Sequence, residues 1–108
     1  EQAVDRNIMV FRINGAFFFG ATARVLQVLE RAGTTPRVFV LDFRDVPLID
    51  TTAARSLVAF VNKLRRGGTE VYFAAARQNV RRMLNRAGLK PPLVRYAANA
   101  ADVAGAPQ

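Results

Sequence analysis

Two patterns of hydrophobic and polar residues follow one another along the chain. Short apolar runs rich in β-branched and aromatic residues predict strands at 8–13, 38–43, 70–75 and 93–96. Apolar residues at helical spacing predict helices at 21–32, 54–64, 80–87 and 99–103. Because strands alternate with helices, we expect an α/β fold in which about four helices cover a mostly parallel sheet of four to five strands. The run at 38–43 is apolar at nearly every position, which predicts a central strand buried on both faces.

Composition removes several classes of function. The chain contains no cysteine and no histidine, so it lacks disulfides, thiolate nucleophiles, the usual zinc ligands and the commonest general base. We therefore expect neither catalysis nor a metal site. The 108 residues fit one compact domain, 1–108, and no stretch approaches the ~20 apolar residues of a membrane span. Because no initiator methionine precedes Glu1, we expect a piece excised from a longer protein.

The net charge of +8 is carried mainly by arginine. An excess of this size is typical of proteins that bind anionic partners, among them nucleic acid, anionic lipid and acidic protein. The alternative is that the arginines only solvate helix faces. The candidate basic surface lies on the third predicted helix and consists of Arg77, Arg81, Arg82 and Arg86. We do not expect specific binding of nucleic acid.

The best candidate for a functional site lies where an apolar run gives way to the second predicted helix. Asp50, Thr51 and Thr52 bring a carboxylate and two hydroxyls to this helix start. There they can cap free backbone N–H groups, meet a bound anion or accept a phosphoryl group. Asp50 or Thr51 is expected to be the N-cap, worth about 1 kcal/mol. Thr52 is not needed for capping, so it is the residue that would carry a switch.

Two glycines and three adjacent phenylalanines mark the region before the first predicted helix. Phe17, Phe18 and Phe19 cannot all point to one face of a strand, so they are a candidate interface, the alternative being that all three pack internally. The segment 15–20 lacks the dinucleotide-binding fingerprint and any phosphate-binding Gly-Lys-Ser/Thr sequence. Backbone freedom explains its glycines.

Four segments of the chain are similar to one known family. VFRINGAFFFGA at 10–21 resembles the first strand and the Gly-Pro-Leu-Phe-Phe-type segment of SulP-type transporters, and VPLIDTTA at 46–53 resembles an apolar-Asp-X-Ser/Thr-Gly signature. RRGG at 65–68 and the helix ending in Ala-Gly-Leu at 80–89 resemble the later helices. The chain thus resembles a STAS domain, the module shared by anti-sigma-factor antagonists and the cytoplasmic tails of SulP-type anion transporters.

The resemblance assigns roles to the residues of the helix start. Asp50 matches the signature aspartate, and Thr52 matches the phosphoacceptor of the antagonists. Ala53 stands where the family usually has glycine. Two partners are open to Arg55, a phosphate on Thr52 or the carboxylate of Asp50. Asp50, Thr51, Thr52, Ala53 and Arg55 are therefore the candidate contacts for an anion or a nucleotide.

The resemblance also implies a function and a setting. It implies an anti-sigma-factor-antagonist-like fold and a cytoplasmic regulatory domain of a sulfate-like anion transporter, at the cytoplasmic face of the inner membrane. The expected partners are the transporter's own transmembrane domain and a protein partner or a second STAS domain of a homodimer. One alternative is a free-standing antagonist switched by phosphorylation of Thr52. Another is a nucleotide-sensing module that binds GTP, GDP or ATP weakly; no other cofactor is expected.

Overall fold

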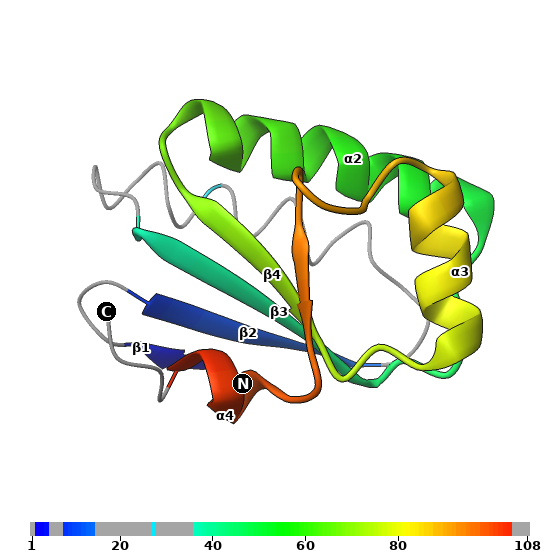
Figure 1. The fold of residues 1–108 in the computed structure, drawn as a ribbon, viewed down its shortest axis with the longest axis horizontal. Coiled ribbons are helices and arrows are strands. Elements are labelled where there is room, and N and C mark those ends of the chain that lie inside the picture. Colours follow the sequence, from blue (N-terminus) through cyan, green and yellow to red (C-terminus); the bar gives the residue numbers. More distant parts are fainter. Residues whose placement is uncertain (1, 5–7, 15–26, 28–35, 105–108) are drawn as a thin grey trace.

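The computed structural model describes residues 2–4, 8–14, 27 and 36–104, and these form an α/β fold around one sheet (Figure 1). The sheet has five strands in the order β1-β2-β3-β4-β5. β2, β3, β4 and β5 run parallel, and β1 pairs antiparallel with β2 at one edge. The strands are β1 (Gln2–Val4), β2 (Ile8–Asn14), β3 (Val38–Asp45), β4 (Glu70–Ala74) and β5 (Arg95–Ala97). The expected mostly parallel α/β sheet is confirmed.

In the described part of the chain, the helices α2 (Thr51–Arg66), α3 (Gln78–Arg86) and α4 (Ala100–Ala104) cover the two faces of the sheet. Figure 1 shows α2 and α3 together on one side of the strands, whereas α4 packs on the other face against β2, β3, β4 and β5. The larger core lies under α2 and α3, where Leu57 and Leu84 are fully buried. A smaller core lies under α4 around Ala100 and Val103. No helix among these elements is both long and apolar enough to cross a membrane.

β3 is the central strand, as its apolar pattern predicted. Phe39, Leu41 and Phe43 belong to the core under α2 and α3, whereas Val38 and Val40 belong to the core under α4. The strand therefore has hydrophobic neighbours on both faces, which explains why its sequence does not alternate with polar residues. Aromatic packing joins this strand to its neighbours: the ring centroids of Phe43 and Phe73 on β4 are 4.9 Å apart, and those of Phe39 and Phe60 on α2 are 5.7 Å apart.

Both long helices end through the same backbone arrangement. The N–H of Thr69 donates to the carbonyl of Leu64 at 3.1 Å, and the N–H of Leu89 donates to the carbonyl of Leu84 at 3.0 Å. The residues before these donors, Gly68 and Gly88, have φ values of +91° and +99°. Only glycine adopts that conformation without strain, so the two glycines set where each helix turns back toward the sheet.

Two elements differ from the sequence-based expectation, and one lies outside the described residues. The last strand begins at Arg95, two positions later than predicted, because the N–H groups of Leu93 and Val94 donate to the carbonyl of Lys90 in a turn. Strand β1 was not predicted, because three residues carry too little pattern to be distinguished from a loop. The helix predicted at 21–32 falls almost entirely outside the described residues.

Candidate functional site

The loop between β3 and α2 is anchored to the core at two points. Val46 and Ile49 are buried, and the N–H of Val46 donates to the carbonyl of Phe43 at 3.0 Å. Between these anchors Leu48 is 57% exposed, the one large hydrophobic side chain so exposed among the described residues. The loop therefore has a fixed course and holds Leu48 in solvent next to the start of α2.

Of the two predicted N-cap candidates, Asp50 and Thr51, the structure shows that Asp50 is the N-cap of α2. Its side-chain Oδ1 accepts a hydrogen bond from the N–H of Ala53 at 2.8 Å, and its carbonyl accepts one from the N–H of Ala54 at 3.0 Å. Its backbone is extended, as at other N-caps. The carboxylate thus satisfies a donor that the helix itself cannot satisfy and lies at the positive end of the helix dipole.

The two threonines after the cap are exposed but differ in their contacts. The hydroxyl of Thr51 donates to Sδ of Met83 on α3 at 3.8 Å, a weak bond. The hydroxyl of Thr52 makes no hydrogen bond to any residue that the structure describes. Ala53 is buried in the main core, so the β-carbon at this position fills space under the helix. Thr52 is therefore the hydroxyl that a modifying enzyme could reach without breaking a contact.

Arg55 points to a groove between α2 and α3 and makes no ion pair with Asp50. The groove has a volume of about 430 Å³ and is lined by Thr51, Ala54, Arg55, Met83, Arg86 and Ala87. The structure therefore brings two predicted site residues, Thr51 and Arg55, together with Arg86 of the predicted basic surface. Thr52 and Ala53 are not part of the lining. The side chains supply two guanidinium groups, a hydroxyl and an apolar floor, a combination that suits an anion.

The predicted basic residues of α3 lie on both sides of this helix. Arg77 occupies the N-cap position, where its side chain makes no capping bond. Arg81 and Arg82 line a second groove, away from α2, together with Ala76, Gln78 and Asn85. Arg86 faces the first groove, so the four arginines surround α3 and do not form one stripe.

Arg81 is held by an aromatic side chain. Its guanidinium carbon lies 4.4 Å from the centroid of the Tyr96 ring, within the range of cation–π attraction. The hydroxyl of Tyr96 donates to the carbonyl of Leu89 at 2.7 Å. Burial raises the pKa of Tyr96 from 10.0 to about 12, and the nearby positive charge of Arg81 opposes part of that rise. Tyr96 therefore stays protonated and fastens α3 to β5.

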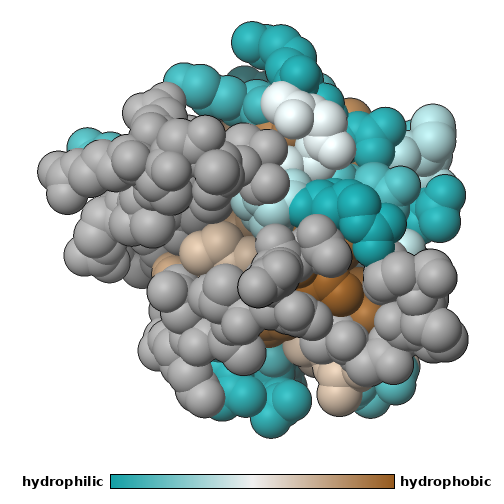
Figure 2. Space-filling model, turned by 90° about the vertical axis from the view of Figure 1, so that its left-hand side faces the viewer, coloured by the Kyte–Doolittle hydropathy of each residue, from teal (hydrophilic) through white to brown (hydrophobic). Residues whose placement is uncertain are grey.

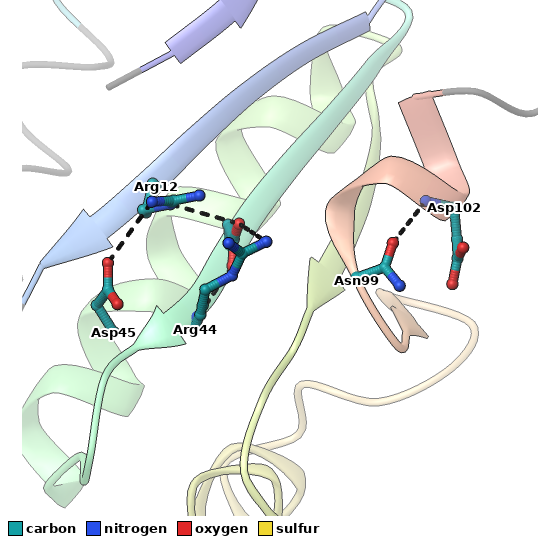
Figure 3. A network of polar contacts seen from close by, with 6 residues as sticks. Arg12, Arg44, Asp45, Asn99 and Asp102 are labelled. Carbon is teal, nitrogen blue, oxygen red and sulfur yellow. Dashed lines mark hydrogen bonds and ion pairs between the residues drawn. The ribbon is translucent and has the colours of Figure 1, made fainter.

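One polar cluster was missed by sequence reasoning (Figure 3). Asp42 is buried in β3, and its Oδ1 accepts a hydrogen bond from the N–H of Arg44 at 2.9 Å. Its Oδ2 lies 3.7 Å from Nε of Arg12 on β2 and 3.9 Å from a guanidinium nitrogen of Arg44. Asp45 lies 4.0 Å from Arg12. The signal that could have found this cluster is a carboxylate within an otherwise apolar buried run.

One predicted interface lies outside the described residues. Phe17, Phe18 and Phe19 lie outside the described residues, so the interface predicted there stays a prediction. Within residues 2–4, 8–14, 27 and 36–104, no three His, Cys, Asp or Glu side chains lie close enough together to hold a metal ion.

Similarity to known proteins extends over nearly the whole chain. The family model of the STAS domain matches residues 1–101. The STAS domain of a SulP transporter from Vibrio cholerae superposes with a TM-score of 0.82 at 23% identity, covering 91% of this chain and 78% of that one. A sulfate transporter family protein from Wolinella succinogenes gives 0.76 at 32% identity, covering 91% and 82%.

The same fold occurs in a second class of proteins. The anti-sigma factor antagonist SpoIIAA, in its unphosphorylated form, gives a TM-score of 0.72 at 18% identity and covers 100% of this chain and 98% of that one. None of the curated proteins is similar in sequence to this chain. The family match, the parallel sheet and the capped helix after β3 agree with one another, and the chain belongs to the STAS domain family.

Proposed function

We propose that this chain is the cytoplasmic regulatory and interaction domain of a SulP-type transporter of sulfate or a similar anion. The observation that carries the proposal is its 32% identity to a sulfate transporter family protein across most of both chains, against 18% to SpoIIAA. In this role the domain does no chemistry of its own. Its partners are the transmembrane domain of the same protein and a second copy of the STAS domain or another protein.

The exposed groups at the start of α2 support a role in interaction. Leu48 and Thr52 are both exposed within a short, well-anchored segment. Loops held in place by a rigid scaffold commonly carry the residues that contact another protein. The carboxylate of Asp50 is engaged in the capping bond from the N–H of Ala53, and the chain contains no histidine that could activate a threonine hydroxyl.

The test is transport by the full-length protein. The reading frame that encodes this chain is expected to continue into membrane-spanning segments, and the product, reconstituted in vesicles, is expected to take up radiolabelled sulfate. Leu48→Ser should alter the uptake rate without changing the amount of folded protein. The matched control is Ala59→Ser on the exposed side of α2, which should leave uptake unchanged. A frame without membrane-spanning segments would refute the proposal.

A second candidate function is an antagonist of an anti-sigma kinase, switched by phosphorylation of Thr52. The observation that favours it is the exposed Thr52 hydroxyl without a hydrogen-bond partner. A phosphate there would add about two negative charges and repel an acidic partner. The test is mass spectrometry after incubation with a cognate kinase, with Thr52→Val as the unmodifiable variant and Thr51→Val as the control. Phosphate on Thr51, or wild-type partner binding by Thr52→Glu, would exclude this switch.

A further inference from the structure

The two helices that cover one face of the sheet carry basic side chains and no acidic ones. α2 contributes four basic residues and α3 contributes three, and neither helix contains Asp or Glu. All are exposed: Arg55, Lys63, Arg65, Arg66, Arg81, Arg82 and Arg86. Solvent-exposed helices usually mix both signs of charge. Solvation of the two helices alone therefore does not explain why all of their charged side chains are positive.

Of the acidic residues that the structure describes, Asp50 borders this face at the start of α2, and the other four lie away from it. Asp42 and Asp45 are close to Arg12 at the end of β3, and Asp50 caps α2 with its carboxylate directed at the backbone. Glu70 begins β4, and Asp102 lies on α4 across the sheet. None of these carboxylates forms an ion pair with Arg55 or Arg86.

The positive charge is spread over a broad surface. In Figure 1, α2 crosses the top of the molecule and α3 stands at one end of it, on the same side of the sheet. Figure 2 shows hydrophilic surface along the top of the molecule, where α2 lies in Figure 1. Charge spread over two helices matches a wide array of negative groups, such as the headgroups of a membrane, better than a single acidic peptide.

The groove between α2 and α3 supplies a place for one phosphate on this face. Arg55 enters from α2 and Arg86 from α3, and Thr51 adds a hydroxyl whose described partner is a thioether. Guanidinium groups bind phosphate oxygens in pairs of hydrogen bonds, and the hydroxyl would provide another donor. Met83 and Ala87, both partly exposed, form an apolar side of the groove against which the glycerol end of a lipid headgroup would lie.

We propose that the α2–α3 face docks onto anionic phospholipid headgroups and that this groove receives a lipid phosphate. The inference rests on the proposed function, because a domain tethered to membrane-spanning segments stays close to the bilayer, where weak electrostatic attraction suffices. Each arginine or lysine near an anionic surface changes the partition coefficient about fivefold. The docked domain would then present the β3–α2 loop at the membrane side of the molecule.

The experiment is co-sedimentation of the chain with vesicles of phosphatidylcholine, with and without phosphatidylglycerol. Binding is expected only with phosphatidylglycerol, and it should weaken as sodium chloride is added. Arg86→Glu should lower the partition coefficient at least tenfold, and Arg86→Lys should restore most of it. The matched control is Arg95→Glu, because Arg95 is exposed, and its register partner Tyr72 lies in the core under α4, so it belongs to the opposite face of the sheet. Its effect should stay below twofold.

Three outcomes would overturn the docking proposal. They are absence of binding to phosphatidylglycerol vesicles at low salt, equal losses for Arg86→Glu and Arg95→Glu, and binding to polyglutamate without binding to vesicles, which would indicate an acidic protein partner. Circular dichroism of each variant verifies that the fold is intact. Vesicle binding by a chain whose reading frame encodes no membrane-spanning segment would refute the transporter assignment and leave the docking surface standing.

Discussion

Asp42 shows how a carboxylate can be kept inside a sheet. Its side chain is 3% exposed, so it has lost nearly all of its hydration. The N–H of Arg44 and two guanidinium groups replace that water, while the side chains of Arg12 and Arg44 remain 31% and 54% exposed. The positive partners therefore keep part of their own solvation, which lowers the cost of burying the pair. The cluster ties β2 to β3 just before the functional loop.

Asp42→Asn should lower the free energy of unfolding by about 2 kcal/mol, because the two ion contacts are lost and the hydrogen bond from the N–H of Arg44 loses its charge assistance. The matched control is Asp45→Asn, whose carboxylate is 44% exposed and only 4.0 Å from Arg12. Its effect should be about 0.5 kcal/mol or less. Urea unfolding followed by circular dichroism measures both, and equal effects would show that burial at Asp42 is unimportant.

Tyr96 makes stability depend on pH in the alkaline range. Its pKa is raised to about 12 in the fold, mainly by burial. Between about pH 10 and 12 the unfolded chain therefore loses the phenolic proton while the folded chain keeps it. The unfolded state binds fewer protons there, so the contribution of Tyr96 to stability is complete below pH 10 and declines as the pH rises toward 12. Urea unfolding at several pH values, with Tyr96→Phe beside the wild type, measures this decline.

The control for this titration is the second tyrosine, Tyr72, which is present in both proteins. The difference between the wild-type and Tyr96→Phe curves thus isolates Tyr96. The two curves should diverge in slope only above pH 10. Parallel curves throughout that range would show that the proton of Tyr96 is not held by the fold.

At the scale of the element, each end of α2 is set by a specific residue type. Asp50 provides the cap at its start, and Gly68 provides the turn after its end. Because these devices depend on residues close together in sequence, the helix start was predictable from Asp50 and its stop from the glycine pair. The buried stripe that includes Leu57 and Val61 was predictable from helical spacing for the same reason.

Asp50→Ala should lower the free energy of unfolding by about 1 kcal/mol, because the N–H of Ala53 loses its acceptor. Asp50→Asn keeps an acceptor oxygen and should cost much less. Urea unfolding compares the two variants with the wild type. If both variants lost the same amount, the charge of Asp50 and not its capping bond would be the stabilising feature.

The end of β4 holds the one described non-glycine residue with a positive φ, Ala75 at 58°. A β-carbon is strained in this conformation, so Ala75→Gly should raise the free energy of unfolding by about 0.5–1 kcal/mol. Ala76 has no positive φ and packs partly against the main core. Ala76→Gly should therefore lower stability. Thermal unfolding of both variants tests this prediction. A loss of stability in Ala75→Gly would mean that the methyl group of Ala75 is needed.

Features that depend on contacts between distant segments could not be predicted from the sequence. The groove joins Thr51 to Met83, which are 32 positions apart, and the Asp42 cluster needs the pairing of Arg12 with Asp42 across two strands. The local sequence around each of these residues does not indicate which distant residue it will contact. The sequence therefore located the junction at Asp50 and its two threonines but could not show that Arg86 would share a groove with Thr51.

At the scale of the whole molecule, the net charge of +8 opposes compaction. Like charges on α2 and α3 are brought together by folding and are farther apart in the unfolded chain. Salt screens exposed charges over roughly 10 Å at 0.1 M, whereas the buried contacts of Asp42 are screened much less. The repulsive part of the electrostatics should therefore weaken first when salt is added.

Added sodium chloride should raise the midpoint of thermal unfolding of this chain. The response should shrink in the double variant Arg65→Gln/Arg82→Gln, which removes one positive charge from each helix. Differential scanning calorimetry over a series of salt concentrations measures the effect. A midpoint that falls with salt would show that attractive ion pairs outweigh the repulsion between the helices.

The sheet ends on very short strands at both sides. β1 and β5 have three residues each, while the three strands between them have seven, eight and five. A three-residue edge offers few free backbone groups to an incoming strand, and β5 also carries the exposed Arg95. Copies of this domain should therefore resist joining their sheets edge to edge, even when many are crowded together. In any assembly that contains this domain, the contacts between copies should therefore be made by helices and loops.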